Sequence, residues 1–377
     1  MRVTEIEVHR VQCPYHDWIA YEQDHYHGPQ SRTIIVAHTD TGLVGLGEGG
    51  NPDQELLDRY IGSNPFDWIG DETSLHIGMA MYDLMGQAAG VPIYKLFGQK
   101  QRSWVPVASW NVSTHPDRMA ESVRRFAAQG FTWMKYHTSP FENVFDQIAA
   151  MEEVAPPEFK IHFDFTGGGT TDHMPELLAR MAEHRIAGCF EDCIDSGDIQ
   201  GSIDLRRRIR LPIVRHQTKL DCTFEVLMGA GDVYMRGHQR AGPAMRSAGL
   251  FAAGNIPFML QNVGGTITQA YTAHQMAAYP TANFHFITTA ERFAGDVVTE
   301  RPQPVNGFLR VSEQPGLGLT LDREALERLE EKIKGALARK KQRKPTKPSR
   351  ASKERRLEGK RRRSETKRGR RPVGRDD

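Results

Sequence analysis

The sequence predicts a modified (β/α)8 TIM barrel with an α+β N-terminal capping domain. From Trp104 onward, eight short apolar runs alternate with amphipathic stretches, which is typical of a parallel barrel whose strands are joined by helices. An open doubly wound sheet would need a glycine-rich phosphate-binding loop after its first strand, and Ser109-Trp110-Asn111 is not such a loop. The 377 residues are enough for this barrel and a second, smaller domain.

Residues 1–103 are predicted to form the capping domain. Three strands are expected over Val3–Val11, Thr33–His38 and Leu43–Glu48, where apolar and β-branched residues predominate. The long segment Cys13–Arg32 is rich in aromatic residues and histidines, so it is either a lid over a functional site or a solvated hairpin tip. Ser74–Ala88 is the clearest helix, because its apolar residues recur at helical spacing.

The barrel is predicted over residues 104–300, and roughly 200 residues suffice for a lean one. Its strands are expected at Trp104–Ser109, Trp133–Tyr136, Lys160–Phe165, Gly188–Glu191, Pro212–His216, Asp232–Arg236, Pro257–Gln261 and Phe284–Ile287. Amphipathic segments between them, such as Pro116–Gln129 and Thr266–Ala278, are expected to be the crossover helices. Residues 301–338 are expected to return to the capping domain and to end in a charged helix over Asp322–Ala338.

The charge of the chain is divided unevenly. Residues 339–377 carry a net charge of +14, whereas the preceding 338 residues carry −12. This last segment has almost no large apolar residues, so we predict a disordered basic tail. Such a tail could make weak contacts with nucleic acid or another anionic surface, and the alternative is a solubilising extension.

The composition is that of a soluble enzyme, with 39% hydrophobic and 25% charged residues. No stretch is long and apolar enough to span a membrane, and the first residues do not resemble a signal peptide. The spacing of the four cysteines fits neither a disulfide framework nor a zinc ribbon. We therefore expect a cytoplasmic protein with reduced thiols.

Two carboxylates are expected to face each other inside the barrel. Asp164 and Glu191 end the third and fourth predicted strands, and the active site of such a barrel lies at the carboxyl ends of its strands. Two inward carboxylates repel each other unless a cation lies between them, and hard oxygen ligands suit Mg²⁺. The alternative for each residue alone is a helix N-cap. The pair on adjacent strands therefore favours a metal site.

Lys135 and His137 end the second predicted strand. Side chains alternate along a strand, so both are expected to point toward the barrel axis. A lysine beside a metal could stabilise an enolate oxygen or act as a base. His137 titrates near neutral pH, which suits general base catalysis, although it could also be a satisfied polar plug of the barrel.

These residues resemble the enolase superfamily, in its mandelate racemase and muconate lactonizing enzyme branch. The resemblance covers about residues 1–332 and is most specific in Ala80–Gly86 and Gly90–Gly98, with further similarity in Asp232–Gly242 and Gly254–Pro257. It implies an Mg²⁺ enzyme that removes the proton next to a carboxylate and stabilises the enediolate. It also implies that Asp164 and Glu191 are metal ligands and that Lys135 is the first lysine of a Lys-x-Lys pair.

The sequence departs from the family pattern at four positions. His137 replaces the second lysine, and Gln217 falls where a third metal carboxylate is expected, with His216 beside it. Gln261 replaces a seventh-strand histidine and cannot take a proton. Arg236 lies where the muconate-type members carry a lysine, and a permanently charged arginine more plausibly binds a substrate carboxylate. We therefore predict Gln217 as a weak metal ligand, and His216, Arg236 and Gln261 as substrate-binding residues.

The departures favour a reaction that needs one base, such as the elimination of water from an acid sugar. A racemase or epimerase needs a base on each face of its substrate, and it remains an alternative. A second alternative is a non-catalytic barrel that has lost full metal chemistry. The expected partner is a small carboxylate, and the resemblance implies a homo-oligomer.

Overall fold

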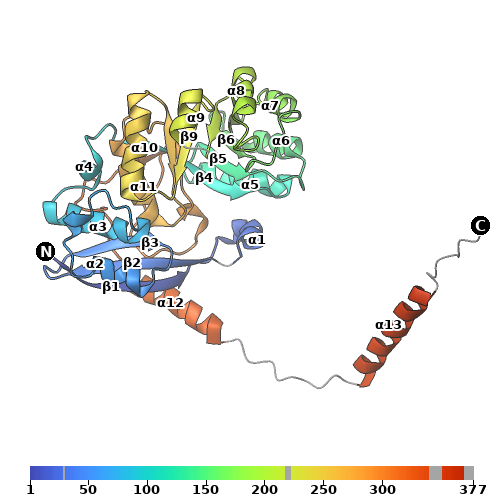
Figure 1. Cartoon of the computed structure of the whole chain (residues 1–377), viewed down its shortest axis with the longest axis horizontal. Helices are drawn as coiled ribbons and strands as arrows, with labels where there is room; N and C mark the ends of the chain where they lie inside the picture. The colour runs from blue at the N-terminus through green and yellow to red at the C-terminus, as the bar shows by residue number, and fades with distance from the viewer. Residues whose placement is uncertain (29, 217–221, 339–349, 369–377) are drawn as a thin grey trace, which may run out of the picture. The chain divides into compact units, whose positions relative to one another are not determined.

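The computed structural model describes residues 1–28, 30–216, 222–338 and 350–368 (Figure 1). Its internal contacts divide the chain into two units, Met1–Ile333 and Lys334–Asp377. The predicted ligand Gln217 lies outside the described residues. No helix in the described ranges is long and apolar enough to cross a membrane.

The first unit contains the predicted closed barrel. Eight parallel strands pair in sequence order, and the last pairs with the first: β4 (Trp104–Val112), β5 (Trp133–His137), β6 (Lys160–Asp164), β7 (Ala187–Glu191), β8 (Ile213–Arg215), β9 (Val233–Gly237), β10 (Phe258–Gln261) and β11 (Phe286–Ile287). The bounds agree with the predicted runs to within a few residues. The barrel prediction is confirmed.

Helices cover the outside of the barrel (Figure 1). They are α5 (Pro116–Ala128), α6 (Val144–Val154), α7 (Met174–Met181), α8 (Ile199–Arg208), α9 (Cys222–Met228), α10 (Ala241–Ala253) and α11 (Thr266–Ala278). The short elements α4 (Tyr94–Phe97), η2 (Ala290–Arg292) and β12 (Phe308–Arg310) complete this part of the chain, and β12 extends the barrel sheet by pairing antiparallel with the start of β4.

The capping domain is built on a three-stranded antiparallel sheet. Its elements are β1 (Val3–Gln12), α1 (Asp17–Tyr26), β2 (Ser31–Thr39), β3 (Val44–Gly49), α2 (Gln54–Tyr60), η1 (Pro65–Trp68) and α3 (Leu75–Ala89). Helix α3 begins after Ser74, whose hydroxyl accepts a hydrogen bond from the backbone of Ile77. It packs so closely on β3 that a Cβ on Gly45 would lie 2.3 Å from the carbonyl oxygen of Ala80. Glycine is therefore required there.

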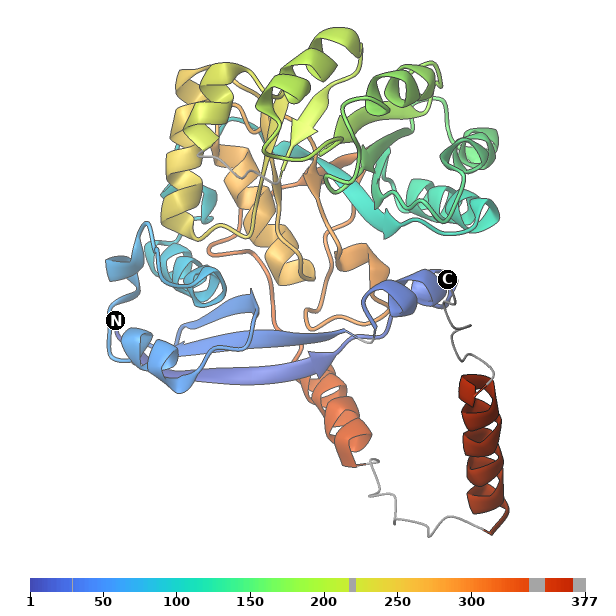
Figure 2. The same cartoon turned by 45° about the vertical axis from the view of Figure 1, so that its right-hand side comes forward.

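The sheet lies across one end of the barrel, and α1 reaches β4 and α5 (Figure 2). The segment Cys13–Arg32, expected as a loop, thus contains a helix. After β12 the chain returns to the cap, as expected: the backbone N–H of Leu317 donates to Asp83 of α3. Helix α12 (Arg323–Ala338) places Arg323 against Glu7 of β1.

The described part of the basic tail contains a helix. Residues 350–368 form helix α13 (Arg350–Arg368), although the composition suggested disorder. Arginine, lysine, glutamate and alanine are good helix formers, so local propensity favours a helix even where no apolar face exists to pack. Residues 356–365 of α13 are mostly exposed, which fits a helix without a core.

We expect a chain that ends at Ala338 to keep the fold and the activity of the full chain. The contacts of the first unit end near Ile333, so deleting residues 339–377 removes none of its core. The measurement is the melting temperature by circular dichroism, with activity assayed in parallel. A fall of several degrees would show that the tail supports the first unit.

Candidate functional site

Lys135 lies at the centre of a buried polar cluster inside the barrel. Its side chain is fully buried, and its Nζ lies 2.8 Å from both carboxylate oxygens of Glu191. The same nitrogen lies 3.0 Å from Asp164 Oδ2 and 2.9 Å from Gln261 Oε1. Burial alone would lower the pKa of Lys135, but Glu191 and Asp164 raise it above its usual value. The cluster therefore holds an ammonium.

Glu191 is surrounded by donors. His162 Nε2 lies 2.7 Å from its Oε2, and His216 Nδ1 lies 3.0 Å from its Oε1. Burial would raise the pKa of Glu191, but Lys135 and the two histidines hold it well below its usual value. Oε1 of Glu191 is therefore hydrogen-bonded by Lys135 and His216. Oε2 is buried without a hydrogen bond and has only the distance-based charge contacts with Lys135 and His162.

His137 lies between Asp164 and the capping domain. Its Nε2 lies 3.1 Å from Asp164 Oδ2, and its Nδ1 lies 2.7 Å from the hydroxyl of Tyr26 in α1. Burial and Glu191 would raise the pKa of Asp164, but Lys135 and His137 lower it below its usual value. Because Asp164 is ionised, it accepts from Nε2–H, which leaves Nδ1 to accept from Tyr26.

His216 follows β8 on the other side of the cluster. Its backbone N–H donates to Asp192 Oδ1 at 2.9 Å, and Glu191 holds its Nδ1. The side chains of His216 and His137 are each 21% exposed, whereas Lys135 and Glu191 beneath them are fully buried. The two histidines are therefore the members of the cluster that a solute can reach.

The five residues form a continuous chain of polar contacts: His137, Asp164, Lys135, Glu191 and His216. Strands β5 and β8 are separated by two strands of the eight, so the chain crosses the barrel. Four of the five lie at or just beyond the carboxyl ends of their strands, where the active sites of such barrels are found, and Lys135 lies two residues before the end of β5. The predicted catalytic residues and two of the three predicted metal ligands are thus brought together.

Two buried histidines were not predicted. His162 precedes Asp164 by two positions on the inward face of β6, and its Nδ1 lies 3.0 Å from His285 Nε2. Cys189 of β7 is close enough to both rings that their ligand atoms lie within 4.8 Å of one another. Burial lowers the pKa of both histidines, so both rings are neutral at physiological pH. Period-2 alternation from Asp164 and Glu191 would have placed His162 and Cys189 inward.

The remaining predicted residues have different positions. Gln261 lies in the cluster and binds Lys135. Arg236 lies on β9, where Met235 points inward to Lys135 and Tyr234 points outward to stack on Phe251. Alternation places Arg236 on the outward face with Tyr234. Its substrate-binding role stays a prediction, and this placement does not favour it.

Helix α1 and the residues after it lie over His137 at the barrel mouth. The ring of Trp110 from β4 contacts the rings of Tyr26, His27 and His137. His27 also lines a cavity of about 410 Å³. Residues of β3, α3, the loop after β10 and the segment before β2 complete its lining, among them Gln30, Arg32, Glu48, His76 and Val263. This adjoining cavity meets the cluster only through ring contacts, because His27 and His137 both contact Trp110 and no side chain of the cluster lines the cavity. The segment predicted as a lid bounds it.

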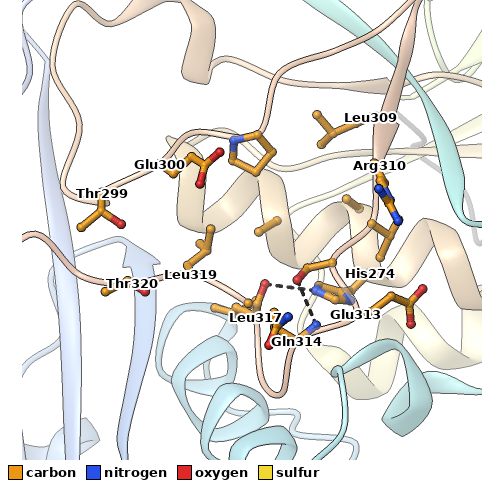
Figure 3. A pocket seen from close by; sticks show the side chains of 16 residues that line it. His274, Thr299, Glu300, Leu309, Arg310, Glu313, Gln314, Leu317, Leu319 and Thr320 are labelled. Carbon is orange, nitrogen blue, oxygen red and sulfur yellow. Dashed lines mark hydrogen bonds between the residues drawn. The ribbon is translucent and has the colours of Figure 1, made fainter.

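A second cavity of about 410 Å³ lies elsewhere, between α11, β12 and the segment that follows it (Figure 3). His274 points into it from α11 and contacts the carbonyl oxygen of Leu317 at 3.2 Å. Its lining residues belong neither to the cluster nor to the carboxyl ends of the strands. We therefore place the functional site at the cluster.

Glu291 should make stability depend on pH. Its carboxyl group is buried and accepts from the backbone N–H of Trp110 at 3.0 Å. Burial raises the pKa of Glu291 from 4.5 to about 7. The folded state therefore favours the protonated form, so this contribution to stability is complete below about pH 4.5 and is lost as the pH rises through 7.

We expect Glu291→Gln to remove that dependence. Between pH 5 and 8, the free energy of unfolding of the wild type should fall by about 2–3 kcal/mol relative to that of the variant. Urea unfolding at the two pH values measures this difference. If the free energies of unfolding of the two proteins changed equally with pH, the pKa of Glu291 would not be raised in the folded protein.

Comparisons with known proteins agree with this fold. The model of the family described as Enolase C-terminal domain-like matches residues 118–325. The chain is 25% identical to cis-3-hydroxy-L-proline dehydratase of Roseibium aggregatum over 85% of this chain and 96% of that one. It is 22% identical to N-succinyl-L-Arg/Lys racemase of Bacillus cereus, over 87% and 98%. The crystal structure of an isomerase from Streptomyces coelicolor superposes with a TM-score of 0.71 at 21% identity, over 89% and 98%.

Proposed function

The chain belongs to the enolase C-terminal domain-like family, in the mandelate racemase and muconate lactonizing enzyme-like branch, and on that premise we propose that it removes the proton next to the carboxylate of a small acid. Relatives in this superfamily are named as dehydratases, racemases, epimerases and cycloisomerases. Of these, we propose a dehydratase-type lyase acting on an acid sugar or a related hydroxy acid.

The observation that carries the proposal is the position of His137. It is partly exposed at the barrel mouth, and Asp164 fixes its tautomer by accepting from Nε2–H. Nδ1 is then the basic nitrogen, and it now accepts from the hydroxyl of Tyr26. A substrate that displaces this hydroxyl presents its α-proton to Nδ1, so α1 would release the base as the substrate enters.

The family generally uses Mg²⁺ beside a lysine or histidine base. Mg²⁺ requires carboxylate oxygens at about 2.0–2.1 Å in a near-octahedral arrangement. Here Asp164 Oδ2 and both oxygens of Glu191 lie within 3.0 Å of Lys135 Nζ, so an ion could bind between them only if the ammonium left. The described side chains therefore do not fit Mg²⁺ between these carboxylates. The proton transfers proposed for His137 and His216 therefore involve no metal ion.

His216 provides the second group that an elimination needs. Glu191 holds its Nδ1, which leaves Nε2 to exchange a proton with a ligand. His137 would take the α-proton, the C–H electron pair would form the C=C bond, and the β C–O bond would break as His216 protonates the leaving hydroxyl. The products are water and an enol that becomes a 2-keto acid. The adjoining cavity, lined by Arg32 and His27, would hold the rest of the substrate.

The test is a screen of small hydroxy and sugar acids with the full chain in D₂O. We expect at least one acid to lose its α-¹H signal and to yield a 2-keto acid. His216→Gln should keep the exchange of the α-proton and lose the 2-keto acid. If His216→Gln instead abolishes exchange with one enantiomer only, the two histidines act on opposite faces and the enzyme is a racemase. No exchange with any acid would contradict the proposal.

A second candidate is a non-catalytic member of the family. It is favoured by Gln261, which cannot take a proton and instead binds Lys135. Such a protein would bind an acid in the adjoining cavity without exchanging its α-proton. Isothermal titration of the same acids would reveal binding without chemistry.

A further inference from the structure

We propose that the ammonium of Lys135 is the permanent cation of this site and takes the place of a divalent metal. The protein would then fold and bind ligands with no metal at the cluster. The identity of the cation that holds Asp164 and Glu191 together does not depend on the reaction that the site catalyses.

The first support is the oxygen cage around Lys135 Nζ. Four oxygens from Asp164, Glu191 and Gln261 lie between 2.8 and 3.0 Å from this nitrogen. An ammonium has three N–H donors, so four oxygens at these distances satisfy it completely. The ammonium reduces the repulsion between the two carboxylates. That repulsion was the reason for predicting a metal ion from the sequence.

The second support is the engagement of the carboxylate oxygens. On Glu191, Oε1 contacts Lys135 and His216, and Oε2 contacts Lys135 and His162. On Asp164, Oδ2 contacts Lys135 and His137, while Oδ1 accepts from the backbone of Thr166. Hydrogen bonds from Lys135 and His216 occupy Oε1 of Glu191, so an ion would compete with both at this atom. Oε2 makes no hydrogen bond, and Lys135 and His162 are its charged neighbours.

The third support is charge. Two carboxyl side chains, Asp164 and Glu191, surround the single ammonium of Lys135 at 2.8 to 3.0 Å. A divalent ion added beside the ammonium would leave the buried group with a net positive charge, which is costly in a low-dielectric interior. The sequence places the neutral Gln217 where the family resemblance implies a third carboxylate.

The ammonium has no easy route out of the cage. The side chain of Lys135 is fully buried, and Met235 Sδ lies 3.8 Å from its Nζ. The inner faces of the neighbouring strands carry apolar residues such as Val214, Met259 and Ile287. Moving the ammonium through such apolar surroundings is strongly unfavourable.

One rival site lies next to the cage. Ligand atoms of Glu191, Asp192 and His216 lie within 4.8 Å of one another. In this structure Asp192 Oδ1 accepts from the backbone of His216, and Glu191 Oε1 already contacts Lys135 and His216. An ion there would have to break these contacts. The experiment therefore distinguishes the cage from this rival.

The experiment titrates Mn²⁺ into EDTA-treated, desalted full-length protein and follows free Mn²⁺ by electron paramagnetic resonance. For the wild type we expect no site tighter than a Kd of about 1 mM, and a melting temperature that is the same in MgCl₂ and in EDTA. Lys135→Met removes the ammonium and leaves two unpaired carboxylates. It should bind Mn²⁺ at least about tenfold more tightly than the wild type, and Mn²⁺ should raise its melting temperature. Lys95→Met, which removes an exposed lysine, is the matched control.

A wild-type site with a micromolar Kd for Mn²⁺ would overturn the proposal. Asp164→Asn then locates that site: loss of binding places the ion in the cage, and unchanged binding places it at the rival site. A folded Lys135→Met protein that binds Mn²⁺ no better than the wild type would also overturn it, because the ammonium would not be what excludes the ion. If Lys135→Met does not fold, the wild-type titration alone decides. None of these measurements uses enzymatic activity, so they stand apart from the search for a substrate.

Discussion

Replacing His137 by glutamine is expected to lower the rate of α-proton exchange by a factor of at least about 100. Glutamine keeps a polar group of similar reach beside Asp164 and Tyr26 but cannot accept a proton at physiological pH. Positioned general bases contribute about 10²–10⁴ to the rate, so the loss should fall in kcat more than in KM. Deuterium incorporation followed by NMR measures it.

The matched control is His184→Gln. His184 precedes β7 at the opposite end of the barrel and contacts Glu152, so its loss should leave exchange unchanged. An unchanged rate in His137→Gln would remove His137 as the base and would direct attention to His216. Equal losses in both variants would indicate general damage to the fold.

Much of the cluster follows from the sequence by simple geometry. Alternation along β5 predicts that Lys135 and His137 point inward, and the strand ends predict that Asp164 and Glu191 lie nearby. These four residues do meet in the structure. The prediction works because strand alternation and barrel closure are local and topological rules that need no knowledge of side-chain conformation.

The contacts that decide the chemistry could not be predicted in this way. The partner of His137 Nδ1 is Tyr26, which lies 111 positions earlier in a segment that the sequence suggested was a loop. Likewise, Glu291 meets the backbone of Trp110 only because β4 and β11 close the barrel. The placement of Lys135 Nζ within the carboxylate cage depends on rotamers, which alternation does not specify. Charge counting alone therefore could not show that the Lys135 ammonium lies between the two carboxylates.

Replacing Glu48 by alanine is expected to destabilise the first unit by about 3–5 kcal/mol, the usual effect of leaving a buried charge unpaired. Glu48 is the penultimate residue of β3 and forms a buried ion pair with Arg32 of β2. Its carboxylate also accepts from the backbone N–H groups of Gly265, at 2.8 Å, and of Thr268, at 3.1 Å. Alanine would leave Arg32 charged and buried, and it would leave two N–H groups at the start of α11 without acceptors.

The effect should exceed that of an ordinary ion pair because Glu48 joins two parts of the fold. Strands β2 and β3 belong to the capping sheet, whereas α11 belongs to the barrel. The control is Glu55→Ala, which removes an exposed ion pair with Arg59 and should cost less than about 0.5 kcal/mol. Urea unfolding followed by circular dichroism measures both variants.

Because the Glu48 carboxylate joins the cap to the N-terminus of α11, Glu48→Ala should also loosen the lid segment before Arg32. Faster amide hydrogen exchange in α1 would show this, and similar costs for the two variants would mean that Glu48 contributes no more than a surface charge.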